Sequence, residues 1–192
     1  MKLITIIIII FFVSNLKASN IGSETGFKIP RFASIKSNEV NVRIGPSTNY
    51  PIKITYITKN YPIKIIDEYK DWRKVSDYFD NVGWIKKNLL SGQRFGIIKS
   101  NNQRKTFVYF SPIDSPIGEI KRFNIVEINR CFVNWCHINY DRYKGWVEKN
   151  NIWGVSKEEI YNISFLNNFE EIIWYLNIYI RRAYQALITI KN

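Results

Sequence analysis

Short runs of alternating apolar and polar residues recur through the middle of this chain. In "VNVRI" (40–44) the three apolar residues fall on one face, while Asn41 and Arg43 fall on the other. This period-two pattern is that of a half-buried strand. Further strands are expected after turn residues, in "PIKIIDEY" (62–69), "WRKV" (72–75) and "GWI" (83–85). Several short strands within about 60 residues predict a small β-barrel or sandwich.

The chain also contains a two-copy repeat. The segment "DWRKVSDYFDNVGWIKKNLLSG" (71–92) aligns with "NWCHINYDRYKGWVEKNNIWG" (134–154), tryptophan on tryptophan and glycine on glycine. Upstream, "VRIGP" (42–46) pairs with "VYFSP" (108–112), and the differences in length fall where turns are expected. A unit of this size buries only about 60% of its unfolded surface and is marginally stable alone. Packing of the two copies on each other would therefore help both.

The first residues are expected to lie outside the fold. Met1-Lys2 is followed by an apolar run up to Val13, interrupted only by Thr5, and then by "LKA" (16–18). This layout is typical of a secretory signal peptide, residues 1–18, cut after Ala18, because the run is short for a membrane span. An uncleaved membrane anchor is the alternative. We therefore expect a periplasmic or secreted protein.

The segment 155–192 is expected to form a C-terminal α-helical extension outside both repeat units. Ser156 with Glu159, and Asn167 with Glu170, fit the pattern of a helix N-cap with an acid at the third helical position. Apolar residues then recur at steps of four and three over 169–190, which predicts an apolar seam. This seam could lie across the barrels, mediate self-association, or contact a membrane surface.

The strand-and-loop motifs resemble a known family. "VNVRIGPSTNYPI" (40–52), "DWRKV", "GWI" and "LLSG" closely resemble the bacterial SH3 domain, in the version found in exported, often alphaproteobacterial, proteins. The resemblance is strong over 31–99 and degenerate in the second copy, which lacks the Asn-Val-Arg and Gly-Pro-Ser elements. It implies a mainly β fold with two tandem SH3-like β-barrels, domain 1 over 31–99 and domain 2 over 100–154. It also implies that the loop 45–61 borders a ligand groove.

Candidate binding residues are aromatic and arginine side chains near that loop. Trp84 and Trp146 are expected in the core, whereas Trp72 follows a turn where SH3-like barrels often place a groove-lining aromatic. Tyrosine and tryptophan offer rigid apolar area with a hydrogen-bonding edge, and arginine offers bidentate contacts to carboxylates. The candidate ligand-binding set is Arg43, Tyr50, Tyr56, Tyr61, Trp72 and Arg73.

The two cysteines are expected to form a disulfide. Alignment of Trp72 with Trp135 places Cys131 over Glu68 and Cys136 over Arg73, on either side of a turn between antiparallel strands. Cysteines that face each other across such strands can bond, and export favours the oxidised form. The alternatives are a catalytic pair of Cys136 with His137, whose side chains would point to opposite faces of a strand, and a zinc site, for which these cysteines and His137 are one ligand short.

No familiar catalytic motif occurs, so no enzyme, cofactor or metal is expected. The net charge of +12 suits anionic envelope polymers. We expect a non-catalytic binding module of the cell envelope that recognises cell-wall peptide, glycan or a peptide segment. The alternative is an envelope assembly protein that dimerises or recruits a partner through its C-terminal helix. Nucleic-acid binding is a third option, which export disfavours.

Overall fold

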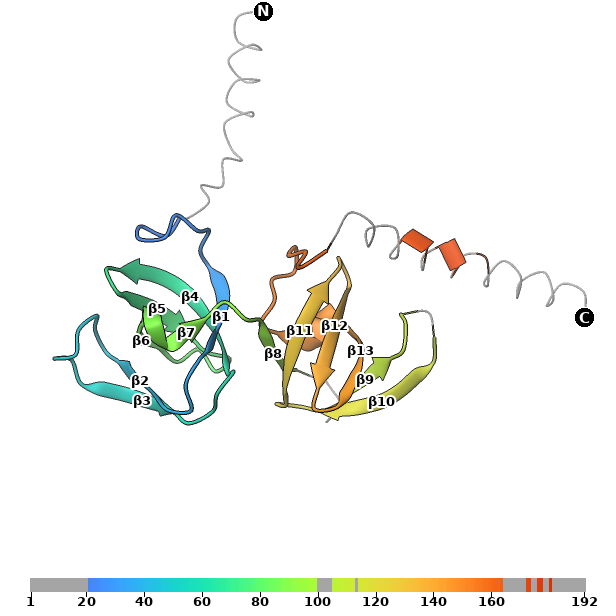
Figure 1. The fold of residues 1–192 in the computed structure, drawn as a ribbon, viewed down its shortest axis with the longest axis horizontal. Helices are drawn as coiled ribbons and strands as arrows, with labels where there is room; N and C mark the ends of the chain where they lie inside the picture. The colour runs from blue at the N-terminus through green and yellow to red at the C-terminus, as the bar shows by residue number, and fades with distance from the viewer. Residues whose placement is uncertain are drawn as a thin grey trace, which may run out of the picture.

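The computed structural model describes residues 21–99, 105–112 and 114–163, together with 172, 173, 176, 177 and 180. Within these residues the chain is mainly β and forms two antiparallel sheets of seven strands each, which lie side by side (Figure 1). Each sheet wraps around its own hydrophobic core, and we call them the first and second half-barrel. The expected signal peptide, 1–18, lies outside the described residues.

The first half-barrel has the strand order β3-β2-β6-β5-β4-β1-β7. A short 3-10 helix, Lys87–Leu89, leads from β6 into β7. Its strands are β1 (Arg31–Ile35), β2 (Val40–Arg43), β3 (Ile52–Tyr56), β4 (Pro62–Tyr69), β5 (Trp72–Ser76), β6 (Val82–Lys86) and β7 (Leu90–Ser91).

The second half-barrel has the strand order β10-β9-β13-β12-β11-β8-β14. It also has a short 3-10 helix, Lys149–Asn151, before its last strand. Its strands are β8 (Phe95–Ile98), β9 (Lys105–Tyr109), β10 (Pro116–Lys121), β11 (Ile125–Cys131), β12 (Trp135–Tyr140), β13 (Tyr143–Glu148) and β14 (Ile152–Trp153).

The two half-barrels are copies of one topology. The two sheets have the same strand order, because adding seven to each strand number of the first sheet gives the strand at the same place in the second. The registers agree as well, because Arg43 pairs with Trp84 in one copy and Tyr109 pairs with Trp146 in the other. The repeat aligned on the tryptophans is therefore confirmed at the level of strand pairing.

Aliphatic residues fill both cores. In β6, Ile85 is fully buried in the first core, whereas the side chain of Trp84 lies on the opposite face with Lys74 Nζ 6.0 Å from its ring centre. Successive residues of a strand point to opposite faces, so both cannot enter the same core. Trp146 likewise stacks on Phe132, with ring centres 5.4 Å apart, and is not part of the aliphatic cluster. The expectation that Trp84 fills the core is therefore wrong, whereas Trp146 is buried as expected, at 4% exposure, beside the aliphatic cluster.

The polypeptide crosses between the half-barrels earlier than the sequence suggests. The segment Phe95–Ile98, expected in domain 1, is β8 and pairs with β11 and β14 of the second sheet. The linker just before β8, residues 93–94, is hydrogen-bonded to both half-barrels. Ser34 Oγ donates to the carbonyl of Gln93 at 2.7 Å, and Arg94 Nη2 donates to the carbonyl of Gly154 at 2.7 Å.

Aromatic rings pack across the junction of the half-barrels. Trp153 of the second copy meets Phe32 and Tyr78 of the first edge-on, with ring centres 5.2 and 5.8 Å apart. Tyr78 also meets Phe123 at 5.9 Å. These contacts and the bound linker hold the two copies against each other.

The chain continues on the second half-barrel after β14. Val155 belongs to the second core, and Tyr161 forms a β-bridge with Cys131. Ser156 and Glu159 make the expected capping contact, from Ser156 N to Glu159 Oε2 at 3.0 Å, but it closes a turn and not a helix. The helix expected over 155–192 is not supported here, since nearly all of 164–192 lies outside the described residues.

Candidate functional site

A groove runs along one end of the first half-barrel. It lies between the loop after β2 and the turn between β4 and β5, and it is lined by Pro46, Ser47, Tyr50, Tyr69, Lys70, Asp71 and Trp72. Its volume is about 600 Å³. The rings of Tyr50 and Tyr69 are 45% and 46% exposed, so they are available to a ligand.

The loop that forms one wall is closed by short-range bonds. Ile44 N donates to the carbonyl of Pro51 at 3.2 Å, and Arg43 Nη1 donates to the carbonyl of Tyr50 at 2.6 Å. The ring of Tyr50 packs directly over Gly45, where any side chain would collide with it. Arg43 therefore orders the loop, and its guanidinium already has a partner in the protein.

The opposite wall is the turn between β4 and β5. Tyr69 and Trp72 pair across this turn, and Lys70 takes a left-handed backbone conformation with φ 49°. Arg73 is 5% exposed and lies beneath the turn, where Nη1 donates to the carbonyls of Lys70 and Trp72, both at 2.9 Å. The predicted ligand contact of Arg73 is therefore replaced by a supporting role, because its donors point inward.

A buried carboxylate holds Arg73 in place. The side chain of Glu68 is fully buried, and its Oε1 lies 2.7 Å from Arg31 Nη2 and 3.4 Å from Arg73 Nε. The N-terminal segment (21–28) closes over it. Glu68 accepts hydrogen bonds from the backbone N–H groups of Glu24 and Thr25 and from the Thr25 hydroxyl. Such a carboxylate is stable only while these donors stay in place.

Lowering the pH from 7 to about 3 is expected to destabilise the first half-barrel. Burial raises the pKa of Glu68, but hydrogen bonds from Arg31, Thr25 and Glu24 N–H outweigh burial and lower it below its ordinary 4.5. A carboxyl group whose pKa is lower in the folded than in the unfolded state stabilises the fold. This stabilisation is complete above the pKa of the unfolded state and is lost as the pH falls through the pKa of the folded state. Urea midpoints measured between pH 7 and 3 should decrease, and less steeply in Glu68→Gln. An unchanged slope in that variant would contradict the assignment.

The second half-barrel has a covalent bond at the same place. Cys131 and Cys136 pair across the β11–β12 turn as Glu68 and Arg73 pair across the β4–β5 turn, and they form the predicted disulfide. His137 Nδ1 lies 3.1 Å from Asn129 Nδ2, and burial lowers the His137 pKa, as do Arg130 and Lys144 nearby. The alternative catalytic pair is wrong because Cys136 has no free thiol.

The structure brings together only part of the predicted set. Tyr50 and Trp72 line the groove, and Trp72 is only 9% exposed, so it serves as both core and groove wall. Tyr56 and Tyr61 stack on each other at 5.0 Å and pack against the first core, away from the groove lining. Tyr56 donates to Asp77 Oδ2 at 2.7 Å.

The prediction missed Tyr69, which faces Trp72 across the turn. Its signal was present in the sequence, since an aromatic on each side of Lys70-Asp71 places two rings at one hairpin end. Lys70 Nζ lies 5.3 Å from the centre of the Tyr69 ring, and Asp71 pairs with Lys87 at 2.7 Å. The groove rim therefore carries both charges beside its aromatic rings.

Two features are absent from the described residues. These residues contain no group of three or more His, Cys, Asp or Glu side chains placed to hold a metal ion. They also contain no helix that is both long and apolar enough to cross a membrane.

Comparison with known protein families gives one match in two segments. A family model described as the bacterial SH3 domain matches residues 36–92 and residues 119–154. The first match covers β2 to β7 with the groove, and the second ends at the glycine that follows β14. No curated protein matches the chain.

Two solved structures are similar to part of this chain. NlpC2 from Trichomonas vaginalis has a TM-score of 0.30 and 15% identity, with 66% of this chain and 49% of that chain covered. An NlpC/P60 family protein from Bacillus cereus has a TM-score of 0.29 and 12% identity, with 64% and 55% covered. The chain thus spans about half the length of these proteins.

Proposed function

This chain is a bacterial SH3 domain protein with two tandem copies of the domain, and from that premise we propose that it is a non-catalytic binding protein of the cell envelope. Its ligand is an extended segment of cell-wall peptide or glycan, or a peptide of similar shape. The binding site is the groove between the 45–50 loop and the 69–72 turn. The observation that carries the proposal is this groove with its exposed Tyr50 and Tyr69.

The chemistry of the groove supports such a ligand. Exposed tyrosine rings stack on the apolar faces of sugars or side chains, and their hydroxyl groups provide hydrogen bonds. Lys70 and Asp71 on the rim can pair with the charged groups of a wall peptide. The net charge of +12 attracts anionic wall polymers over a longer range, and more strongly at low salt.

Both walls of the groove are ordered before a ligand arrives. Arg43 closes the loop on one side, and Arg73 with Glu68 supports the turn on the other. A preorganised site loses less conformational entropy on binding than a flexible one. This favours the first copy as the binding domain.

Replacing Tyr50 with alanine is expected to weaken binding to purified sacculi. A central aromatic contact of this kind contributes about 2 kcal/mol, which is roughly a 30-fold loss of affinity. The protein from residue 19 onward is mixed with sacculi and pelleted, and the bound fraction is measured at low and at 150 mM salt. Phe110→Ala is the matched control, since that ring is 74% exposed and belongs to the second copy. No retention of the wild type at low salt would overturn the proposal.

Export and the assembly alternative stay predictions. Localisation to the envelope follows from the expected signal peptide, whose residues lie outside the described part of the chain. Self-association through 169–190 concerns residues of which only Ile172, Ile173, Leu176, Asn177 and Ile180 are described. Binding through the groove is therefore the function argued from described contacts.

A further inference from the structure

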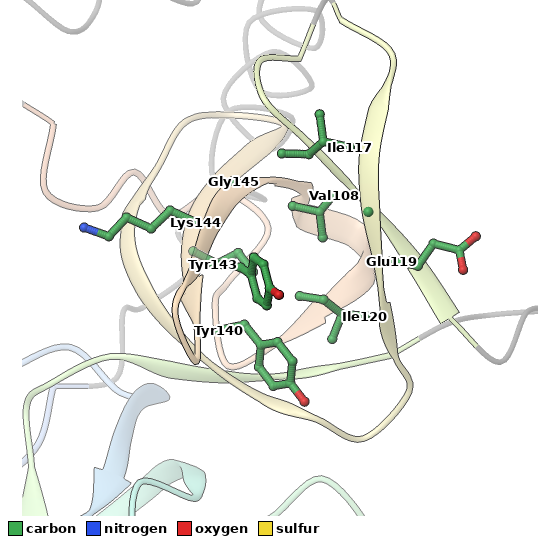
Figure 2. A pocket seen from close by; sticks show the side chains of 10 residues that line it. Val108, Ile117, Glu119, Ile120, Tyr140, Tyr143, Lys144 and Gly145 are labelled. Atoms are coloured by element: carbon green, nitrogen blue, oxygen red, sulfur yellow. The ribbon is translucent and has the colours of Figure 1, made fainter.

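The second half-barrel contains an apolar pocket that the first-copy groove does not resemble. Its volume is about 340 Å³, and its walls come from β9, β10, β12 and β13. Figure 2 shows Val108, Ile120, Tyr140 and Tyr143 directed toward the pocket, whereas the charged ends of Lys144 and Glu119 point away from it. The interior therefore offers aliphatic and tyrosine surface to an uncharged group.

The pocket exists because one isoleucine of the first copy is a glycine in the second. In the first half-barrel Val42 pairs with Ile54, whose side chain packs against the core. At the equivalent pair, Val108 faces Gly118, and a Cβ built on Gly118 would meet no atom within 4 Å. The first copy thus shows which chemical group fills this position: a branched aliphatic side chain.

The strand that carries Gly118 lies at the edge of its sheet. β10 is the terminal strand, and among the described residues no strand pairs with its outer edge. Every residue of β10 except Ile120 is exposed. An edge with free N–H and C=O groups is a surface on which an extended peptide can add as a further strand.

We propose that the second half-barrel binds an extended peptide that pairs with β10 and inserts one branched aliphatic side chain into this pocket. The backbone of the peptide supplies the hydrogen bonds to β10. Alternate side chains of a strand point to one face, so one of them is directed over Gly118. The inserted side chain occupies the volume that Ile54 occupies in the first copy. This site does not depend on the first-copy groove.

The test uses a small probe with the same chemistry. N-acetyl-isoleucine N-methylamide carries the missing side chain and two amides, and it is titrated into the isotope-labelled protein from residue 19 onward. We expect saturable amide shifts concentrated at 117–120 and 138–145. In Gly118→Ile the affinity for the probe, measured from these shifts, should fall roughly tenfold or more, because the new side chain fills the pocket.

The variant is expected to fold, so its result is informative. Gly118 does not need a left-handed backbone, and its Cβ position is open. The melting temperature of Gly118→Ile should therefore equal or exceed that of the wild type. Equal probe shifts in the variant, or no saturable shifts in the wild type, would overturn the proposal. Equal affinity for 2-methylbutan-1-ol, which lacks the amides, would overturn the strand pairing and indicate a pocket for a small apolar ligand.

Discussion

Replacing Glu68 with glutamine is expected to lower the free energy of unfolding by about 3–5 kcal/mol, the usual effect of removing one partner of a buried ion pair. Glutamine keeps the size of the side chain but removes the negative charge. Arg31 and Arg73 then lie close together without the negative charge of Glu68. Glutamine also has one side-chain oxygen, whereas Glu68 offers two to Thr25, the Glu24 N–H and Arg31. Urea unfolding followed by tryptophan fluorescence measures the change.

The matched control is Glu39→Gln, which removes the same charge from an exposed position of the same half-barrel. It should change the stability by less than about 0.5 kcal/mol. If the two variants unfold at the same urea concentration, the buried network does not stabilise the fold. Glu68→Gln should also weaken ligand binding, since Arg73 would no longer be held beneath the Tyr69–Trp72 turn.

Replacing both Cys131 and Cys136 with alanine is expected to lower the free energy of unfolding by about 2 kcal/mol. The bond closes a short loop, so it restricts the unfolded chain only modestly. Both cysteines are fully buried and belong to the second core, so lost packing adds to this loss. The urea midpoint of the second half-barrel reports the effect.

Reduction provides an independent check on the same bond. Wild-type protein that is unfolded and refolded with a reducing agent should have a lower free energy of unfolding. Its value should be closer to that of the double-alanine variant than to that of the oxidised protein. The disulfide has no exposed surface, so the native protein should resist the reductant. A variant as stable as the oxidised wild type would contradict a stabilising role.

The sequence predicted those features that depend on local spacing. The tryptophan alignment anticipated the shared strand order and the position of Cys131 and Cys136, because both follow from strand-and-turn lengths. The alternation in 40–44 correctly predicted β2. These elements form between neighbouring segments, where the period of the pattern carries the information.

Features that depend on distant segments were not predictable in this way. Arg73 looked exposed because the residues that cover its partner Glu68 are distant in the chain. Thr25 and Glu24, whose N–H groups bind Glu68, lie 43 and 44 residues before it. The position of Phe95–Ile98 follows from pairing with β11 and β14, and a short apolar run does not indicate which sheet it joins. Tyr56 and Tyr61 were assigned to the groove because they flank its loop, but their rings turn toward the core.

The placement of the two covering segments sets an order for folding when the chain emerges from its N-terminus. The segment that covers Glu68 precedes its half-barrel, so every part of the first copy has been synthesised once Ser91 has emerged. The segment that pairs with Cys131 follows the second half-barrel in the chain. The second copy is therefore complete only when Tyr161 has emerged. Because domains generally fold as units in the order in which they emerge, the first copy can fold before the second. It can then serve as a folded template for the aromatic junction.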